Sequence, residues 1–248
     1  MGLASLWQRL RGRTADSHTA HGGRPIPDAL WQSTLSEYGF LQALPADEQS
    51  RLRQLASHFL AQKEFHGAQG LEVTDAMAVA IAAQACLPLL HWGAPEQALR
   101  WYGDFVGIVV HPGEVLARRE AVDEAGVVHH YDEVLSGEAM EHGPVMLSWQ
   151  DVAAAGSSAE TGYNVVVHEF AHKIDMCNGE PDGCPPLPAG FMGATSPRAA
   201  HAAWRAVLEP AFDAFREQVI IAERFGGAEP WLDPYGAESP TEFFRSEE

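Results

Sequence analysis

The sequence is short of cysteine, has few basic residues and contains no long apolar run. Its three cysteines, Cys86, Cys177 and Cys184, form no CxxC pair, which is typical of a reducing compartment rather than of disulfide-bonded secreted domains. No apolar run approaches the ~18 residues that a membrane-spanning helix requires. The apolar stretch at the N-terminus is short and is followed by arginines, whereas a secretory signal has its basic residues first. We therefore expect a cytoplasmic protein without a membrane segment.

Basic residues are outnumbered by acidic ones, with 16 Lys and Arg against 34 Asp and Glu and a formal net charge of −18. A surface of this sign repels phosphate backbones, so direct binding to nucleic acid is disfavoured. The sequence also lacks the GxSxG element of serine hydrolases, the P-loop and the GxGxxG fingerprint. These absences argue against a serine nucleophile elbow and against a nucleotide-binding loop.

The chain is predicted to consist of a flexible N-terminal tail, residues 1–24, and a single domain, residues 25–248. This domain is long enough to bury a core. Apolar residues at helical spacing predict helices over 45–65, 75–87, 149–156, 160–177 and 197–223. Runs rich in valine and isoleucine predict strands over 104–112, 114–122, 126–135 and 144–149. The predicted fold class is α+β, with N-terminal helices packed on a small, mostly antiparallel or mixed sheet beside the helix of residues 160–177.

The stretch NVVVHEFAHKID, residues 164–175, carries the strongest chemical signal. On a helix, residues i and i+4 share a face, so His168 and His172 can both direct an imidazole nitrogen at one ion. Neutral imidazole suits Zn²⁺, and HExxH on a helix is the metalloprotease pattern. Glu169 is placed to act as general base on a zinc-activated water without being a ligand itself. Three valines before the motif indicate a helix that enters from a buried segment, which argues against two histidines on an exposed helix face.

A catalytic zinc needs a third protein ligand and one open position. The extension HExxHxxGxxH is absent, because position 175 is Asp and position 178 is Asn. A distant ligand, most often a carboxylate, must then complete the site. Spacing alone leaves five candidates open: Glu209, Glu217, Glu223, Glu238 and Glu242. Asp175 follows on the same helix face as the two histidines, where it is placed to orient a ligand imidazole.

Four segments together resemble the Mlc titration factor A family of zinc metallopeptidases. The most specific are HEFAHKID (168–175) and DPYGAESPTEFF (233–244), and WYGDFVGIVVHPGEV (101–115) and PVMLSWQDV (144–152) support them. The resemblance runs from about Pro25 to Phe244, which is most of the chain. It implies a zincin-like domain with a gluzincin-like site.

The resemblance also implies roles for particular residues. One Zn²⁺ is expected to be held by His168, His172 and Glu242, with Glu169 as the general base. Tyr235 matches a tyrosine near the zinc, where a phenol can donate a hydrogen bond to the developing oxyanion. An extended peptide substrate is expected to pair with an edge strand of the sheet, for which residues 104–110 or 144–149 are the candidates.

Members of this family are aminopeptidases that act on short alanine-type peptides, and the best known ones also bind a glucose-responsive transcriptional repressor, Mlc. The resemblance therefore implies hydrolysis of short peptides and a repressor as a partner. The alternative is a weakly catalytic or non-catalytic binding protein that sequesters a transcriptional regulator. It stays open because this chain ends at Glu248, barely two turns into the helix of Glu242, whereas family members continue, and a short terminal helix frays. Two explanations stay open at this point: a native protein shortened relative to the family, or a sequence that is a fragment of a longer chain.

Overall fold

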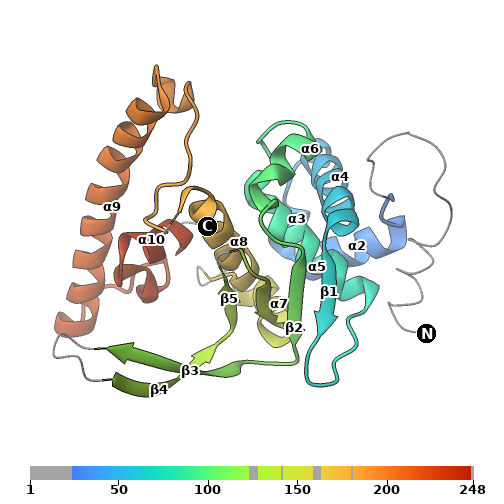
Figure 1. The fold of residues 1–248 in the computed structure, drawn as a ribbon, viewed down its shortest axis with the longest axis horizontal. Helices are drawn as coiled ribbons and strands as arrows, with labels where there is room; N and C mark the ends of the chain where they lie inside the picture. The colour runs from blue at the N-terminus through green and yellow to red at the C-terminus, as the bar shows by residue number, and fades with distance from the viewer. Residues whose placement is uncertain (1–23, 123–127, 141, 159–162, 180, 247–248) are drawn as a thin grey trace.

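The computed structural model describes residues 24–122, 128–140, 142–158, 163–179 and 181–246. Its helices and its small mixed sheet confirm the predicted α+β class (Figure 1). Of the predicted tail, residues 1–23 lie outside the described ranges, and the division into a tail and one domain stays a prediction. No helix within the described ranges combines the length and the apolar character needed to cross a membrane.

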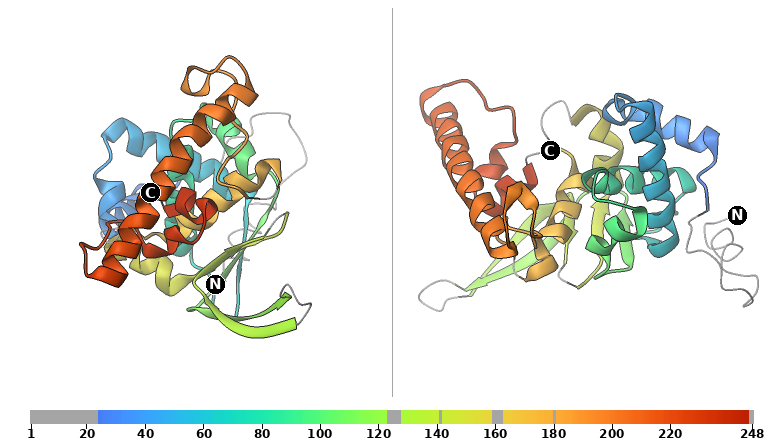
Figure 2. Two further views of the ribbon diagram at one scale, coloured as in Figure 1. Left: turned by 90° about the vertical axis from the view of Figure 1, so that its left-hand side faces the viewer. Right: turned by 90° about the horizontal axis from the view of Figure 1, so that it is seen from above.

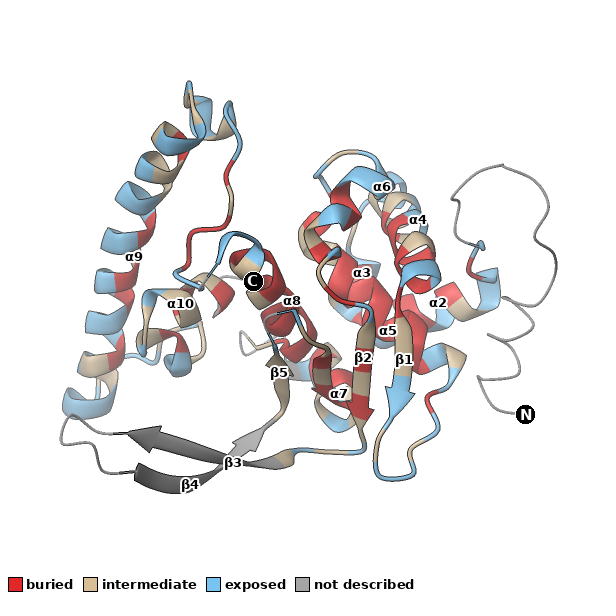
Figure 3. Cartoon of the chain, viewed as in Figure 1, coloured by how far each residue is buried: buried red, intermediate tan, exposed pale blue. Residues whose placement is uncertain are grey.

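The N-terminal part of the fold is helical. It contains α2 (Asp28–Glu37), α3 (Gly39–Gln42), α4 (Ala46–Gln62), α5 (Asp75–Cys86), η1 (Leu87–Leu89), α6 (Pro95–Ala98) and η2 (Leu99–Tyr102). The Thr74 hydroxyl caps α5 by accepting the N–H of Met77 at 3.3 Å, a role typical of threonine. Every residue of α5 from Met77 to Cys86 is buried (Figure 3). This alanine-rich helix therefore lies at the centre of the main core.

The predicted helix over 45–65 is too long at its C-terminal end. α4 ends at Gln62, and β1 (Glu64–Gly67) follows directly. Phe65 lies in this strand and pairs with Ile108 of β2 (Gly107–His111). Its apolar side chain fits the helical pattern by sequence spacing, but strand pairing with a distant segment determines its conformation.

The main sheet has four strands in the order β1-β2-β6-β5, completed by β5 (Gly137–Ala139) and β6 (Val145–Ser148). β1, β2 and β6 run parallel, and β5 is antiparallel to β6. The prediction that residues 104–110 or 144–149 form the edge is wrong, because both segments supply central strands. Their alternate residues are fully or almost fully buried, and such apolar runs are typical of a sheet interior. The edges are β1 and β5.

The other two predicted strands form a separate antiparallel ribbon. β3 (Val115–Val122) and β4 (Val128–Leu135) pair along their whole length, from Val115 opposite Leu135 to Val122 opposite Val128. The ribbon projects from the body of the molecule (Figures 1 and 2). Both strands were predicted, but their assignment to the main sheet is wrong, because each finds its partner in its neighbour along the chain. β4 then leads into the edge strand β5.

The prediction that the helix from residue 149 ends at Gly156 is also wrong. α7 (Trp149–Ser158) continues through this residue. A Cβ at Gly156 would lie 2.7 Å from the carbonyl oxygen of Glu37. The glycine therefore permits close packing of α7 against the end of α2, instead of terminating the helix.

The C-terminal part begins with the motif helix. It contains α8 (Val165–Asp175), η4 (Met176–Asn178), η5 (Phe191–Gly193), α9 (Pro197–Phe225), η6 (Pro234–Ala237) and α10 (Pro240–Ser246). α9 confirms the predicted helix 197–223 with two further residues, and it ends at Gly226, which has a φ of 69°. Figure 1 shows α10 between α9 and α8. A small apolar cluster, which is separate from the main core, joins α9 to α10: Leu208, Phe212, Phe215, Val219 and Phe243.

Candidate metal centre

The motif helix α8 is fixed at its N-terminus by Asn164. The side-chain Oδ1 of Asn164 accepts hydrogen bonds from Val166 N at 3.0 Å and Val167 N at 3.1 Å. Its Nδ2 donates to Gln84 Oε1 of α5 at 3.0 Å. The backbone of Asn164 is extended, so the predicted start at residue 160 is too early. The cap sets where the helix begins and ties it to the central helix of the core.

His168 and His172 lie on one face of α8, as their spacing predicts, with ring centroids 5.1 Å apart. His168, Glu169 and His172 each offer one ligand-type atom, and these three atoms lie within 4.8 Å of one another. His168 is buried, and this burial, followed by the positive charge of Arg245, lowers its pKa to about 3. The imidazole is therefore neutral near pH 7, which is the form that binds a metal ion.

Glu169 is buried between α8 and the edge strand β5. A Cβ at Gly137 of β5 would lie 2.6 Å from Glu169 Cγ and 2.7 Å from its Oε1. Burial raises the pKa of Glu169 to about 8, with the nearby Glu242 adding to the rise, while Arg245 and the backbone N–H of Ala139 oppose it. Glu169 Oε2 is buried and has no hydrogen-bond partner among the described residues. Burial thus favours the protonated carboxyl when no cation is nearby.

Glu242 comes to this cluster from α10. Its Oε2 lies 3.6 Å from His168 Nε2, and its Oε1 lies 2.5 Å from an Nη2 of Arg245. The backbone N–H of Glu242 donates to Ser239 Oγ at 3.1 Å, which anchors the first turn of α10. Of the five glutamates left open by sequence spacing, Glu242 is the one within ion-pair distance of His168. The remaining four have exposed positions on α9 or beside η6: Glu209, Glu217, Glu223 and Glu238.

The pair His168 and Glu242 has the spacing of a zinc site, whereas the three ligand-type atoms that lie within 4.8 Å of one another belong to His168, Glu169 and His172. In a tetrahedral site with ligand bonds of about 2.0–2.2 Å, ligand atoms lie about 3.3–3.6 Å apart. The 3.6 Å between His168 Nε2 and Glu242 Oε2 matches this separation. Two imidazoles and a carboxylate are a ligand set typical of catalytic zinc. His168, His172 and Glu242 are the residues that would hold the ion, with Glu169 beside it.

Two phenols flank His168. The ring of Tyr235, in η6, has its centroid 6.4 Å from that of His168, and Tyr235 is 45% exposed. The ring of Tyr163, just before the helix cap, lies 6.3 Å from His168. Burial and the charge of Glu169 raise the pKa of Tyr163, so its phenol is protonated at neutral pH. Tyr163 was missed from the sequence, because nothing local marks a tyrosine before a cap as part of a site.

Asp175 is fully buried at the end of α8. Its Oδ2 accepts the backbone N–H of Gly183 at 2.9 Å, so this oxygen holds the loop after the helix. Burial raises the pKa of the Asp175 carboxyl. The predicted contact with a ligand imidazole stays a prediction, and the loop anchor is a role that the sequence did not indicate.

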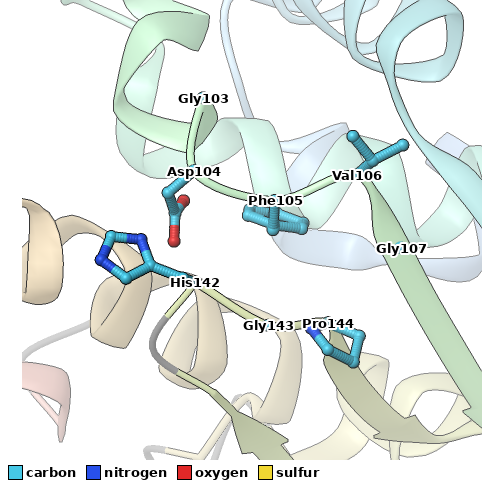
Figure 4. Close-up of a pocket in the computed structure, with 8 residues that line it drawn as sticks. All are labelled: Gly103, Asp104, Phe105, Val106, Gly107, His142, Gly143 and Pro144. Carbon is cyan, nitrogen blue, oxygen red and sulfur yellow. The ribbon is translucent and has the colours of Figure 1, made fainter.

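Lys173 fixes the side of α8 away from the histidines. Its Nζ lies 2.5 Å from Asp104 Oδ2, donates to Met140 O at 2.8 Å and lies 4.7 Å from the centre of the Phe105 ring. Asp104 and Phe105 line a pocket of about 380 Å³ where, as Figure 4 shows, the side chains of Asp104 and His142 point toward each other. This buried lysine therefore ties the motif helix to the β5–β6 turn and to the loop before β2.

A buried HExxH helix with a carboxylate delivered by a later helix is the arrangement of a metallopeptidase. The family model described as "Glucose-regulated metallo-peptidase M90" matches residues 8–246, and the chain belongs to this family.

Curated relatives agree with this assignment. The chain is 34% identical to Mlc titration factor A of Enterobacter sp. (strain 638) over 221 residues, which cover 88% of this chain and 76% of the relative. It is 32% identical over 217 residues to the proteins of the same name from Yersinia enterocolitica serotype O:8 / biotype 1B and Yersinia pestis (strain Pestoides F). These matches cover 87% of this chain and 74% and 73% of the two relatives.

Proposed function

We propose that this protein is a zinc-dependent metallopeptidase with a zincin-like domain, acting as an aminopeptidase on short peptides. The observation that carries the proposal is the approach of Glu242 to His168, since a segment far along the chain brings a carboxylate to the motif helix at 3.6 Å. The three cysteines are free thiols, which supports a cytoplasmic location.

The bound zinc ion would supply Lewis acidity toward a water molecule and toward the scissile carbonyl. Glu169 would take the proton of the attacking water on Oε2, the oxygen without a hydrogen-bond partner in the described part of the chain, and then pass it to the leaving amine. Its raised pKa of about 8 would fall beside a bound cation, because a positive charge favours the carboxylate. Tyr235 would donate its phenolic hydrogen to the developing oxyanion.

The edge strand β5 is the proposed guide for the substrate backbone. β5 pairs with β6 on one side only in the main sheet. Its Gly137 lies against Glu169, so a peptide added to this edge would pass beside the general base.

A second proposal is that the protein binds a transcriptional repressor. It is supported by the name of the relatives, which describes them as titrating Mlc. The two proposals are compatible, and they differ in whether Glu169 is needed. Protein binding does not require a general base, whereas hydrolysis does.

The first experiment is hydrolysis of an alanyl chromogenic substrate by purified zinc-loaded protein beside Glu169→Gln with equal bound zinc. Removal of the general base should lower kcat by roughly 10²–10⁴-fold. Glu217→Gln, at an exposed position on α9, is the matched control and should retain wild-type activity. If wild type and Glu169→Gln both hold zinc and neither cleaves, the peptidase proposal is wrong for such substrates and the binding proposal takes its place.

A further inference from the structure

Arg245 is a buried cation one turn beyond Glu242 on α10. It is 2% exposed, its Nη2 lies 2.5 Å from Glu242 Oε1, and its Nε donates to the carbonyl oxygen of Thr241 at 3.0 Å. Its Nη1 is buried and has no hydrogen-bond partner among the described residues. The guanidinium is therefore committed to one carboxylate, and this carboxylate is the proposed third zinc ligand.

One side of Arg245 faces apolar residues. It lines a cavity of about 200 Å³ whose walls include Val167 and Ala171 of α8, together with Trp204 and Phe244. Burial of an arginine with an unsatisfied N–H carries a desolvation cost that a single ion pair does not necessarily recover. A purely stabilising role would be served as well by an apolar side chain at this position, so the charge points to a role in the site.

Among the described residues, the carboxylates that act on Arg245 are Glu242 and Glu169, and both belong to the candidate metal centre. The two oxygens of Glu242 are divided between two partners, with Oε1 on Arg245 and Oε2 facing His168 Nε2. A carboxylate held at one oxygen presents the other in a fixed direction.

We propose that Arg245 is a positioning residue of the metal centre, which binds Glu242 Oε1 and thereby holds Oε2 toward the ion shared with His168 and His172. This inference rests on the proposed zinc site and goes beyond it, because it concerns a residue that is not a ligand. Partners of metal ligands typically contribute 10–100-fold to metal affinity. Loss of the guanidinium should therefore weaken zinc binding, although it removes a positive charge from beside a cation.

The test is zinc affinity, measured by competition with a chromogenic chelator, for wild type, Arg245→Ala and Arg245→Lys. We expect Arg245→Ala to weaken zinc binding roughly 10–100-fold. Arg245→Lys should recover part of this loss, since it retains a charge but not the planar fork. The visible spectrum of the Co²⁺ form should change in Arg245→Ala. The control is Arg205→Ala, an exposed arginine paired with Asp182, which should bind zinc as wild type does.

A double-mutant cycle separates positioning from general packing. If Arg245 acts through Glu242, then Arg245→Ala should have little further effect on zinc affinity in a Glu242→Ala background. An equal loss in both backgrounds would overturn the inference, as would wild-type or tighter zinc binding by Arg245→Ala. Circular dichroism checks folding, and if Arg245→Ala does not fold, the comparison is made with Arg245→Gln, which keeps a polar side chain without the charge.

The same measurements distinguish this inference from the proposed function. Wild-type protein that fails to bind zinc would contradict the proposed metal centre, and the role of Arg245 would fall with it. Wild-type protein that binds zinc, beside an Arg245→Ala variant with unchanged affinity, would leave the metal centre intact and remove the role of Arg245 alone.

Discussion

The side chain of Glu169, the candidate general base, fills the space beside Gly137 that a larger residue would need for its own side chain. In Gly137→Ala the new Cβ would lie 2.6 Å from Glu169 Cγ, so the carboxylate must move. We expect peptidase activity to fall by about 10²-fold, because a displacement of this size misaligns a catalytic group. Zinc affinity should change little, since the ligand residues are not touched. The control is Gly107→Ala, whose Cβ would meet Pro144 at an ordinary 3.6 Å, and equal activity in the two variants would contradict the argument.

The buried carboxyl of Glu169 makes the stability of the metal-free protein depend on pH. Its pKa of about 8 lies above the value of about 4.5 in the unfolded chain, so the folded state binds more protons between these pH values. The free energy of unfolding therefore falls as pH rises through this window. The lowered pKa of His168 makes the free energy of unfolding rise with pH between 3 and 6.5. Wild type and the variant compared below both contain His168, so this contribution is common to the two proteins.

Glu169→Gln removes this titration and keeps the shape of the side chain. In the presence of a chelator, the variant should gain stability relative to wild type as pH rises from 5 to 8, by on the order of a few kcal/mol. Thermal or urea unfolding at several pH values measures this difference. A difference that stays constant across the range would show that Glu169 titrates normally in the folded protein.

Among the elements, α8 is held by a buried lysine, Lys173, on the side away from its two histidines. Lys173→Met would leave Asp104 without its ion-pair partner and would remove the hydrogen bond to Met140 O. We expect a loss of about 3 kcal/mol in the free energy of unfolding, since one partner of a buried pair is left uncompensated. We also expect weaker zinc binding, because the lysine follows His172 directly.

The matched control is the other lysine of the chain. Lys63 is also buried, and its Nζ donates to Phe105 O at 2.6 Å, but it lies at the end of α4. Lys63→Met should destabilise the fold by a comparable amount and leave zinc affinity nearly unchanged once folding is complete. Chemical denaturation and chelator competition on both variants test this pair, and equal effects on zinc would argue against a specific role of Lys173 in fixing α8.

What the sequence reveals about these elements depends on how local the signal is. α5 and α8 were predicted because the apolar spacing of the one and the HExxH motif of the other each lie within one segment. β5 was not, because the three residues Gly137–Ala139 carry no strand pattern, and their place is set by pairing with β6. The edge of the sheet was assigned wrongly for the same reason. Strand order is a property of distant pairings, which residue patterns along one segment do not contain.

The site shows the same limit. His168, Glu169 and His172 follow from spacing on one helix. The proposed third ligand was left open among five glutamates by spacing, and only the resemblance of the DPYGAESPTEFF segment to the family implied Glu242. Arg245 and Tyr163 were missed, because their relation to His168 and Glu242 exists only once α8, α10 and the helix cap are packed together. The burial that shifts the pKa of Glu169 likewise depends on β5, a strand that the sequence did not indicate.

At the scale of the whole molecule, the candidate metal centre lies between two apolar clusters. The histidines belong to α8, whose Val165, Val166 and Phe170 are part of the main core. Glu242 belongs to α10, which packs with α9 through Phe243 and Phe215 in the smaller cluster. A metal ion bound by both helices would therefore cross-link two parts of the fold that have separate apolar cores.

This arrangement predicts where zinc should stabilise the protein. Ligand binding to the folded state raises stability by mass action, and here it should act most on the docking of α9 and α10. Hydrogen exchange should slow on zinc addition in α9 and α10 more than in α5, whose position in the main core does not depend on the ion. Glu242→Ala should abolish the protection in α9 and α10 while His168 and His172 remain. Uniform protection of all helices, or protection confined to α8, would show that the ion does not join the two clusters.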